Sequence, residues 1–344
     1  MDVLSDVLRA VRLTGALFFD VDAGTPWVGE SPSTATIAAT MMPEAEHVIS
    51  FHAVISGSCW VALTDGSMPP ERLDAGDVAI FPSGLENVMS SERGARGRVN
   101  MALYYNPMDG HLPFRLMRGG DGADRTRFVC GYLGCDTRPF NPLLTALPPM
   151  LCVRKPARME AWVTDLFRLA LEEGGSGRIG GEAILARLSE LMFVEVLRQH
   201  VEALPEDSRG WLSGLRDPQV GAALQLIHAF PAENWTLERL AQRVAMSRSR
   251  FAARFSHYVN VSPIQYLARW RMQLAARQLE APSASIAQVA AGVGYDSEAA
   301  FNRAFKRQVG APPGVWRRAR VGQAAAGAAV NYGPAAGDSV PFSN

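Results

Sequence analysis

The chain carries one sequence pattern twice near its C-terminal end. It reads TLERLAQRVAMSRSRFAARFSHYVNVSP over residues 236–263 and SIAQVAAGVGYDSEAAFNRAFKRQVGAPP over residues 285–313. The matched positions are Leu237 and Ile286, Leu240 and Val289, Ala241 and Ala290, Val244 and Val293, Ser247 and Ser297, Phe251 and Phe301, Phe255 and Phe305, Val259 and Val309, and Pro263 and Pro313. The second copy has one extra residue between its valine and its serine. Because both copies keep the apolar positions and the turn, the sequence predicts two copies of one supersecondary unit.

Each copy predicts a short helix, a tight turn, an N-capping serine and a second helix, which together make a helix-turn-helix. The segment between the copies, PIQYLARWRMQLAARQLEAP, predicts a single helix from about Pro263 to Leu279. Proline suits the first turn of a helix. The buried side of this helix is marked by Ile264, Leu267, Trp270, Leu274 and Leu279. A rigid helix here would fix the separation of the two units.

Charge is distributed unevenly along the chain. The whole sequence holds 34 basic and 34 acidic residues, yet residues 236–320 hold 14 Arg or Lys against 4 Asp or Glu. A locally basic block in a neutral protein presents an attractive field to a polyanion. Only Lys155 and Lys306 are lysines, so the cations of this block are almost all arginine.

The bulk composition is that of a globular protein. The 344 residues indicate about two domains, and 48% of them are hydrophobic and 20% charged. No apolar run approaches the roughly 20 residues of a membrane helix, and the N-terminus lacks the features of a secretory signal. These observations predict a cytoplasmic protein. The four cysteines are irregularly spaced, which favours reduced thiols over a zinc site; they are Cys59, Cys130, Cys135 and Cys152.

The pattern changes from strands to helices along the chain. Residues 1–155 contain short β-branched runs broken by Gly and Pro, typical of a barrel or sandwich. Residues 156–204 predict a helical pair, in which Ile184, Leu188, Leu191 and Met192 share one face. Residues 205–218 are predicted to be a linker and residues 219–321 the helix-turn-helix domain. The tail, residues 322–344, has few large apolar residues and is predicted to be disordered.

The C-terminal third resembles a known family. WRMQLAARQLE and then SIAQVAAGVGYDSEAAFNRAFKRQVGAPPGVWR look like the DNA-binding domain of AraC/XylS-type transcription regulators. The resemblance covers roughly residues 220–320. It implies that the second helix of each unit enters a major groove, with the two grooves one turn, about 34 Å, apart on one face of the DNA. It also implies promoter DNA and RNA polymerase as partners.

The polar faces of the two reading helices suggest different roles. In the second helix Asn302 and Arg303 suit bidentate contacts with base edges, and small Ala299 would allow close approach. The matching face of the first helix offers Ser249, Ala252 and Ala253, which suit thymine-methyl and shape contacts. The residues expected to meet phosphates are Arg248, Arg250, Arg254, Arg269, Arg271, Lys306 and Arg307. For Arg269 and Arg271 a surface ion pair is the alternative.

A second, less specific resemblance lies in the N-terminal part. GDVAIFPSGLEN, residues 76–87, resembles the second cupin motif, with Asn87 where metal-binding cupins place a histidine. His47 and His52 precede Gly57, but no His-x-His pair followed by Glu is present. A metal site needs about three good ligands. The sequence therefore predicts a metal-free, cofactor-free cupin barrel.

Such a barrel can hold a small effector in its interior. His52, Trp60 and Asn87 are the candidates to line it, although strand parity is not determined by sequence. The helical pair is interpreted either as a dimer interface or as a cover on the barrel.

Together these features predict an α+β multidomain protein. It has an N-terminal cupin-like β-barrel, a helical segment for linking or dimerisation, and an all-α double helix-turn-helix domain. The predicted function is a DNA-binding transcription regulator controlled by a small-molecule effector. Two rivals remain open: a metal-dependent cupin dioxygenase or isomerase fused to a DNA-binding domain, and a ligand-independent regulator whose barrel is an interaction module.

Overall fold

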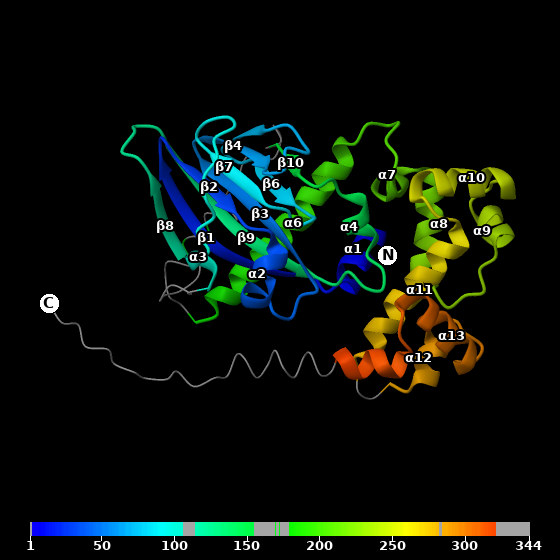
Figure 1. Cartoon of the computed structure of the whole chain (residues 1–344). Helices are drawn as coiled ribbons and strands as arrows, with labels where there is room; N and C mark the ends of the chain where they lie inside the picture. The colour runs from blue at the N-terminus through cyan, green and yellow to red at the C-terminus, as the bar shows by residue number, and fades with distance from the viewer. Residues whose placement is uncertain are drawn as a thin grey trace.

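The N-terminal part of the computed structural model consists of two β-sheets that enclose a common core (Figure 1). The structure describes residues 2–105, 114–154, 169, 172, 179–281 and 284–320. The larger sheet has the order β10-β6-β3-β9-β1-β8 and the smaller one β2-β7-β4-β5. Among the described strands, β1 and β8 pair in parallel and all other pairs are antiparallel. The strands are β1 Thr14–Gly24, β2 Val28–Ser31, β3 His47–Ser56, β4 Ser58–Leu63, β5 Glu71–Asp74, β6 Val78–Phe81, β7 Asn87–Ser90, β8 Phe114–Gly119, β9 Arg125–Cys135 and β10 Leu151–Val153.

The central strand β3 is buried on both faces because each face of the larger sheet is covered. Val54 and its alternate neighbours face the core between the sheets, together with Phe19 and Val61. Phe51 and Ala53 point to the opposite face, where helices pack. The alternation of side chains along a strand therefore serves two different cores.

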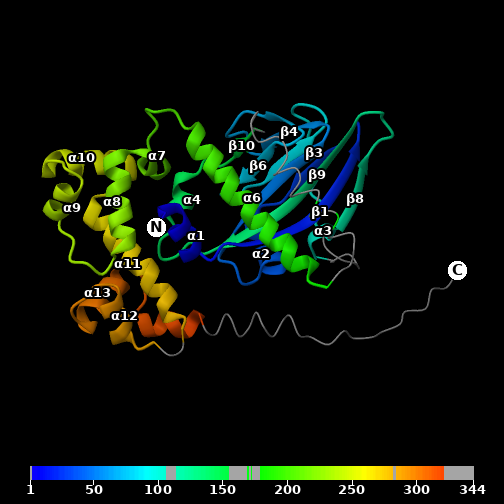
Figure 2. The same ribbon diagram turned by 180° about the vertical axis from the view of Figure 1, so that it is seen from behind.

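Helices cover the outer face of the larger sheet. The N-terminal helices are α1 Val3–Ala10, α2 Thr34–Met41, α3 Ala102–Tyr105, α4 Pro142–Ala146 and α6 Gly181–Ala203. Figure 2 shows α6 lying across the strands. It buries Leu185, Met192 and Val196 there. The helix comes so close at Gly15 that an added Cβ would lie 2.5 Å from the carbonyl oxygen of Ala186.

Only part of the α6 face predicted from sequence packs against the core, since Leu188 and Met192 contact it and the other two residues do not. Met192 is fully buried, but Ile184 and Leu191 expose 42% and 46% of their surfaces. Residues three positions apart lie about 60° apart around a helix. The side chains of Ile184 and Leu191 therefore lie just beside the stripe of α6 that packs on the sheet. The first helix of the predicted pair falls mostly outside the described residues.

The predicted linker contains a packed helix. Within residues 205–218, α7 spans Trp211–Arg216, and Trp211 and Leu212 are buried. The indole nitrogen of Trp211 donates a hydrogen bond of 3.0 Å to the hydroxyl of Tyr266. The segment is thus anchored by its apolar residues, although its Pro and Gly content is typical of a loop.

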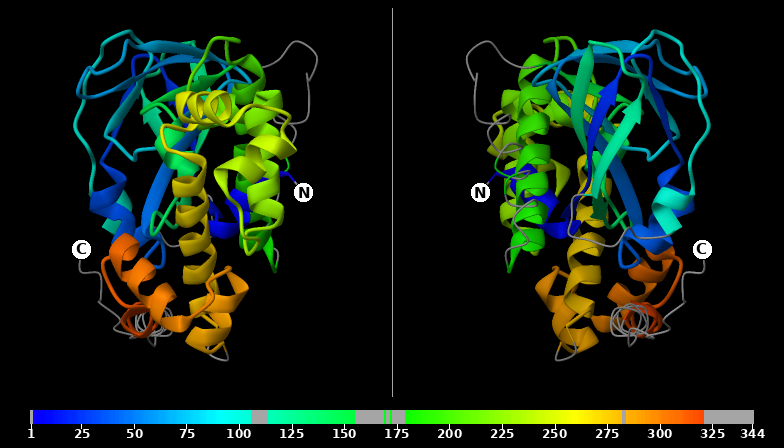
Figure 3. Two further views of the ribbon diagram at one scale, coloured as in Figure 1. Left: turned by 90° about the vertical axis from the view of Figure 1, so that its right-hand side faces the viewer. Right: turned by 90° about the vertical axis from the view of Figure 1, so that its left-hand side faces the viewer.

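The C-terminal part contains the two predicted helix-turn-helix units. Its helices are α8 Pro218–Ala229, α9 Leu237–Arg243, α10 Arg248–Val259, α11 Pro263–Leu279, α12 Ile286–Gly292 and α13 Glu298–Val309. The linking helix α11 has the predicted bounds and begins with a capping box made by Ser262 and Gln265. Figure 3 shows α11 running between the units, with α10 near one end and α12 and α13 at the other. The predicted fold class is confirmed.

The two units belong to different hydrophobic cores. Phe251, Phe255 and Trp270 are part of one continuous core that also includes Phe51 of the sheet and Phe193 of α6. The second unit has a core of its own, built around α12, α13 and the end of α11. The first unit is therefore joined to the cupin part by apolar contacts.

Three further predictions concern the C-terminal tail, the cysteines and membrane-spanning helices. The tail predicted to be disordered lies outside the described residues. All four cysteines are free thiols. None of the helices formed by the described residues is long and apolar enough to span a bilayer.

Candidate nucleic-acid interface and interior cavity

The two reading helices bury their phenylalanines and expose their polar faces. Phe251 and Phe255 of α10, and Phe301 and Phe305 of α13, are fully buried. Among the predicted base-reading residues, Ser249, Ala253, Ala299 and Arg303 are exposed, and Ala252 and Asn302 are half-buried. The predicted faces are therefore at least partly exposed in both units, and the units themselves lie on the side of the molecule away from the sheets (Figure 1).

Two of the seven predicted phosphate-contacting cations, both half-buried, already have partners within the protein. The guanidinium of Arg271 donates to the carbonyl oxygens of Pro231, Glu233 and Gly294 at 2.7, 2.9 and 3.1 Å. Burial lowers the pKa of this half-buried arginine. Arg254 forms a two-pronged ion pair with Asp217, the N-cap of α8. Both arginines link α8 or its neighbouring loop to another helix, a role that spacing in sequence does not reveal.

The remaining cations stay at the surface. Arg248 forms an exposed ion pair of 2.7 Å with Glu238. Arg269 is exposed, and its guanidinium carbon lies 5.9 Å from the ring centre of Phe140. The other three predicted cations are exposed and form no ion pair with a described residue; they are Arg250, Lys306 and Arg307.

A buried histidine forms the polar centre of the core between the sheets. His52 Nε2 lies 2.9 Å from Oδ1 of Asn87, and Nδ1 lies 2.8 Å from Sγ of Cys130. Burial lowers the pKa of His52 to about 4 and raises that of the Cys130 thiol, so both groups are neutral near pH 7. A neutral ring then donates from Nε2 and accepts from the thiol through Nδ1. Because both ring nitrogens are engaged, this histidine does not fit a metal-ligand role.

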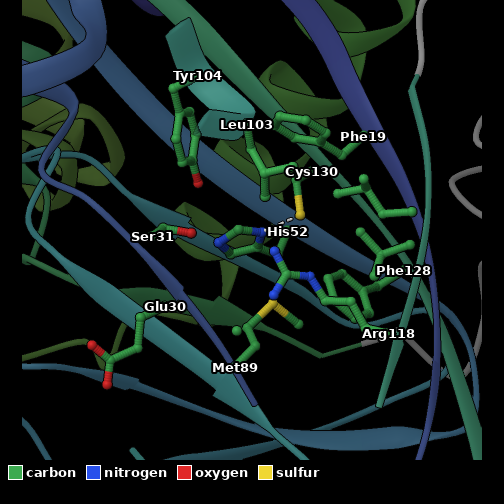
Figure 4. Close-up of a pocket in the computed structure, with 13 residues that line it drawn as sticks. Phe19, Glu30, Ser31, His52, Met89, Leu103, Tyr104, Arg118, Phe128 and Cys130 are labelled. Atoms are coloured by element: carbon green, nitrogen blue, oxygen red, sulfur yellow. Dashed lines mark hydrogen bonds between the residues drawn. The ribbon is translucent and has the colours of Figure 1, made fainter. Parts of the chain in front are cut away.

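A cavity of about 40 Å³ opens beside His52 (Figure 4). Its walls are mostly apolar and come from both sheets and from α3. Figure 4 shows the Tyr104 hydroxyl and the Arg118 guanidinium pointing into it. The lining residues include Phe19, Val21, Ser31, Met89, Leu103, Tyr104, Leu116, Arg118, Phe128 and Cys130.

The structure separates the three residues predicted to face the interior. His52 lines the cavity and Asn87 supports it through the hydrogen bond, but Trp60 is on the other face of its strand. In β4 the residues Cys59 and Val61 are buried inward, so Trp60 between them points outward. It stacks under Arg93 and borders a different hollow of about 160 Å³. The prediction that Trp60 faces inward is wrong because parity was not determined by the sequence.

Sequence reasoning missed Tyr104 and Arg118. Tyr104 comes from α3, a single turn of helix with no periodic pattern. Arg118 ends the run Phe114, Leu116, Arg118, whose alternate spacing places it on the inward face of β8. The alternation of Phe114, Leu116 and Arg118 was the feature of the sequence that could have identified Arg118 as an inward-facing residue.

Polar contacts hold the cupin part against α11. Gln273 is 1% exposed. Its side-chain amide donates a hydrogen bond of 2.9 Å to the carbonyl oxygen of Ala10 and accepts one of 3.0 Å from the backbone amide of Phe140. Arg12 pairs with Asp136 at 2.7 and 2.8 Å and with Glu280 of the α11 C-cap at 3.2 Å.

A second set of contacts connects the cupin part to residues near the end of the described chain. Arg320 lies 2.7 Å from Glu46, and the two Arg138 and Arg320 guanidinium groups flank the ring of Trp316. We call the contacts made by Arg12, Gln273, Asp136, Glu280 and Arg320 the junction.

Comparisons with known proteins agree with this arrangement. A family model described as Cupin matches residues 2–202, and one described as Helix-turn-helix domain matches residues 240–319. An AraC-like transcription regulator of Streptomyces lividans is 35% identical over 325 residues, covering 92% of this chain and 98% of that protein. The HTH-type transcriptional regulator AlkR of Acinetobacter baylyi is 30% identical over 323 residues, covering 92% and 99%.

Among solved structures, the DNA-binding domain of AdpA, determined in complex with a target DNA, is 32% identical. It covers 34% of this chain and 99% of that chain, with a TM-score of 0.29. Both relatives that match over nearly their full length are named transcription regulators, which does not favour the fused cupin enzyme as a rival. The chain belongs to the AraC-type family of DNA-binding transcription regulators that carry an N-terminal cupin domain.

Proposed function

We propose that the chain places α10 and α13 in two neighbouring stretches of major groove on one face of promoter DNA. The observation that carries this proposal is the pair of repeated units with buried phenylalanines and exposed polar faces. The 17-residue helix α11 between them is about 25 Å long at 1.5 Å per residue. A rigid helix of this length supports a constant separation between the two reading helices.

The second unit is the main reader of base sequence in this proposal. Asn302 and Arg303 supply hydrogen bonds to base edges, while Ala299 allows close approach. Ser249, Ala252 and Ala253 of α10 supply apolar and shape contacts. The phosphate contacts are assigned to Arg248, Arg250, Arg269, Lys306 and Arg307. Arg254 and Arg271 leave this set because their guanidinium groups are already bonded, to Asp217 and to backbone carbonyl oxygens respectively.

A small effector in the cavity would control this DNA binding. Strand β9 offers a physical route, because Cys130 lines the cavity and Asp136 directly after the strand holds Arg12. Arg12 in turn contacts Glu280 at the end of α11. An effector that binds one position of β9 better than another would shift the junction and with it the second unit.

We infer two further partners. A second copy of the chain would pair through the outer side of α6, where Ile184 and Leu191 are exposed; sedimentation velocity of the full chain tests this. RNA polymerase would be the partner through which the promoter-bound regulator acts, and this role supports a location in the cytoplasm.

The decisive test is Arg303→Ala analysed by selection of binding sites from random DNA. Loss of a bidentate base contact should relax the preference at one base pair and weaken binding of the selected site by about 1–3 kcal/mol. Arg307→Ala is the matched control. It should weaken binding to all sequences alike and lower the salt dependence by about one phosphate contact. An unchanged base preference in Arg303→Ala would contradict the assignment of α13 as the sequence reader.

A further inference from the structure

The inward face of β8 carries an arginine where apolar side chains precede it. Phe114 and Leu116 are half-buried and Arg118 continues the same face, whereas Arg115 and Met117 between them are exposed. In the parallel pairing with β1, Arg118 lies opposite Ala23, and Leu116 lies opposite Val21. The guanidinium is thus directed into the space between the sheets, next to the apolar residues of the core.

This guanidinium has no hydrogen-bond or ion-pair partner within the part of the chain that the structure describes. The nearby carboxylates are occupied: Asp20 pairs with Arg127 at 2.7 Å, and Glu30 pairs with Arg96 at 2.6 Å. Figure 4 shows the Glu30 carboxylate turned away from the Arg118 guanidinium, which reaches toward His52. Arg118 is half-buried beside these apolar walls, and a cation in such surroundings is stabilised by a partner of opposite charge, so the site favours an anion from outside.

The rest of the cavity suits an anion with a short apolar body. His52 is neutral because burial lowers its pKa to about 4. The Tyr104 hydroxyl, which shares a hydrogen bond with Ser31, lies at the same cavity. The walls from Phe19, Leu103 and Phe128 are apolar. At about 40 Å³ the space corresponds to about three water molecules, which suits a ligand with a short chain.

We propose that the effector is a short monocarboxylate whose carboxylate pairs with Arg118 and whose apolar body packs against Phe19, Leu103 and Phe128. The inference rests on the proposed effector control and names the ligand class. The larger hollow beside Trp60 is the weaker candidate, because Arg96, the one cation among the described residues that line it, is already paired with Glu30.

The test is a ligand-observed NMR titration of the full-length protein with three probes of one chain length: butanoate, butan-1-ol and butylammonium. Guanidinium–carboxylate bonds are charge-assisted, so butanoate should bind about tenfold or more tightly than the alcohol. Butylammonium should not bind, because its charge repels that of Arg118.

Three variants locate the site. Arg118→Met removes the charge and keeps the length, and should abolish the preference for butanoate over butan-1-ol. Arg118→Lys keeps the charge and should retain the preference. Arg115→Met is the matched control, since Arg115 is exposed on the opposite face of the same strand, and it should behave like wild type. Thermal unfolding of Arg118→Met should show no loss of stability, because an unpaired charge has left an apolar face.

Each outcome decides the inference. Equal affinity for butanoate and butan-1-ol, no binding of any probe, or an unaltered preference in Arg118→Met overturns it. DNA binding measured on the same samples separates this result from the proposed function. Intact sequence-specific DNA binding without carboxylate binding refutes only the ligand class, whereas absent DNA binding refutes the proposed function itself.

Discussion

At the scale of single residues, equal side chains in the basic block have unequal roles. Arg250 and Arg271 both looked like phosphate contacts in sequence. Arg250 is exposed, with no ion pair among the described residues, while Arg271 donates to three carbonyl oxygens of the loop after α8 and the turn of the second unit. Arg250 is available to a polyanion in solution, whereas Arg271 satisfies backbone carbonyl groups that would otherwise lack donors.

The variants Arg271→Met and Arg250→Met should separate these roles. Arg271→Met should lower the free energy of unfolding by about 2 kcal/mol, because three carbonyl acceptors lose their donor. Its affinity for DNA per folded molecule should change little. Urea unfolding and DNA titration of the same samples measure both quantities.

Arg250→Met is the matched comparison. Its stability should stay within about 0.5 kcal/mol of wild type. Its DNA affinity should fall for all sequences, with a salt dependence reduced by about one contact. A stable Arg271→Met variant with weakened DNA binding would reverse our assignment.

At the scale of elements, the two turns solve the same problem with different residues. Ala245 in the first turn and Gly294 at the matching place in the second both have positive φ, 53° and 81°. At Gly294 the backbone also approaches its neighbour closely, since an added Cβ would lie 2.5 Å from the carbonyl oxygen of Ala232. The second turn therefore requires glycine for both conformation and space.

Gly294→Ala should destabilise the protein by about 2–4 kcal/mol and release α12 from α13. Gly310→Ala, at the C-cap of α13, is the control: its φ is 87°, but nothing lies within 4 Å of the added Cβ. It should cost only about 1 kcal/mol of conformational strain. Chemical unfolding of both variants measures the difference, and equal costs would show that the contact with Ala232 is unimportant.

At the scale of the whole molecule, tertiary packing places the two copies of the repeat in different environments. Phe255 of the first unit lies in the core shared with the sheet, whereas Phe305 of the second unit lies in a separate core. The second unit reaches the cupin part through polar contacts such as Arg12 with Glu280. Segments that share a buried apolar core tend to unfold together. Because the two helix-turn-helix units lie in different cores, the free energies of their local unfolding should differ.

Hydrogen exchange of Phe255→Leu and Phe305→Leu should reveal this asymmetry. Each substitution removes buried volume from an equivalent repeat position and should cost about 1 kcal/mol. Phe255→Leu should lower amide protection in α9, α10 and the strands β3 and β9 together. Phe305→Leu should lower it in α12 and α13 alone. Equal loss of protection in β3 and β9 for both variants would show that the molecule unfolds as one unit.

Much of the fold was predictable because it depends on local pattern. The repeat predicted both units and the bounds of α11, since helix periodicity and capping residues act within a few positions. The cupin interior was less predictable. His52 and Asn87 were identified, but Trp60 was assigned to the wrong face and Arg118 was missed. A shift of one residue in strand parity reverses every side chain, and short runs do not determine it.

The sequence by itself determined the two helix-turn-helix units and predicted the polar faces they present, because these follow from spacing along single helices. Its resemblance to AraC-type regulators also indicated the family, which the comparisons confirmed. Only the tertiary structure decided which arginines are free to meet DNA, which unit shares a core with the cupin part, and which charge enters the cavity. These properties depend on contacts between residues far apart in the chain, such as Arg12 with Glu280 and Gln273 with Ala10. No local pattern records such contacts, because they are set by how the layers pack.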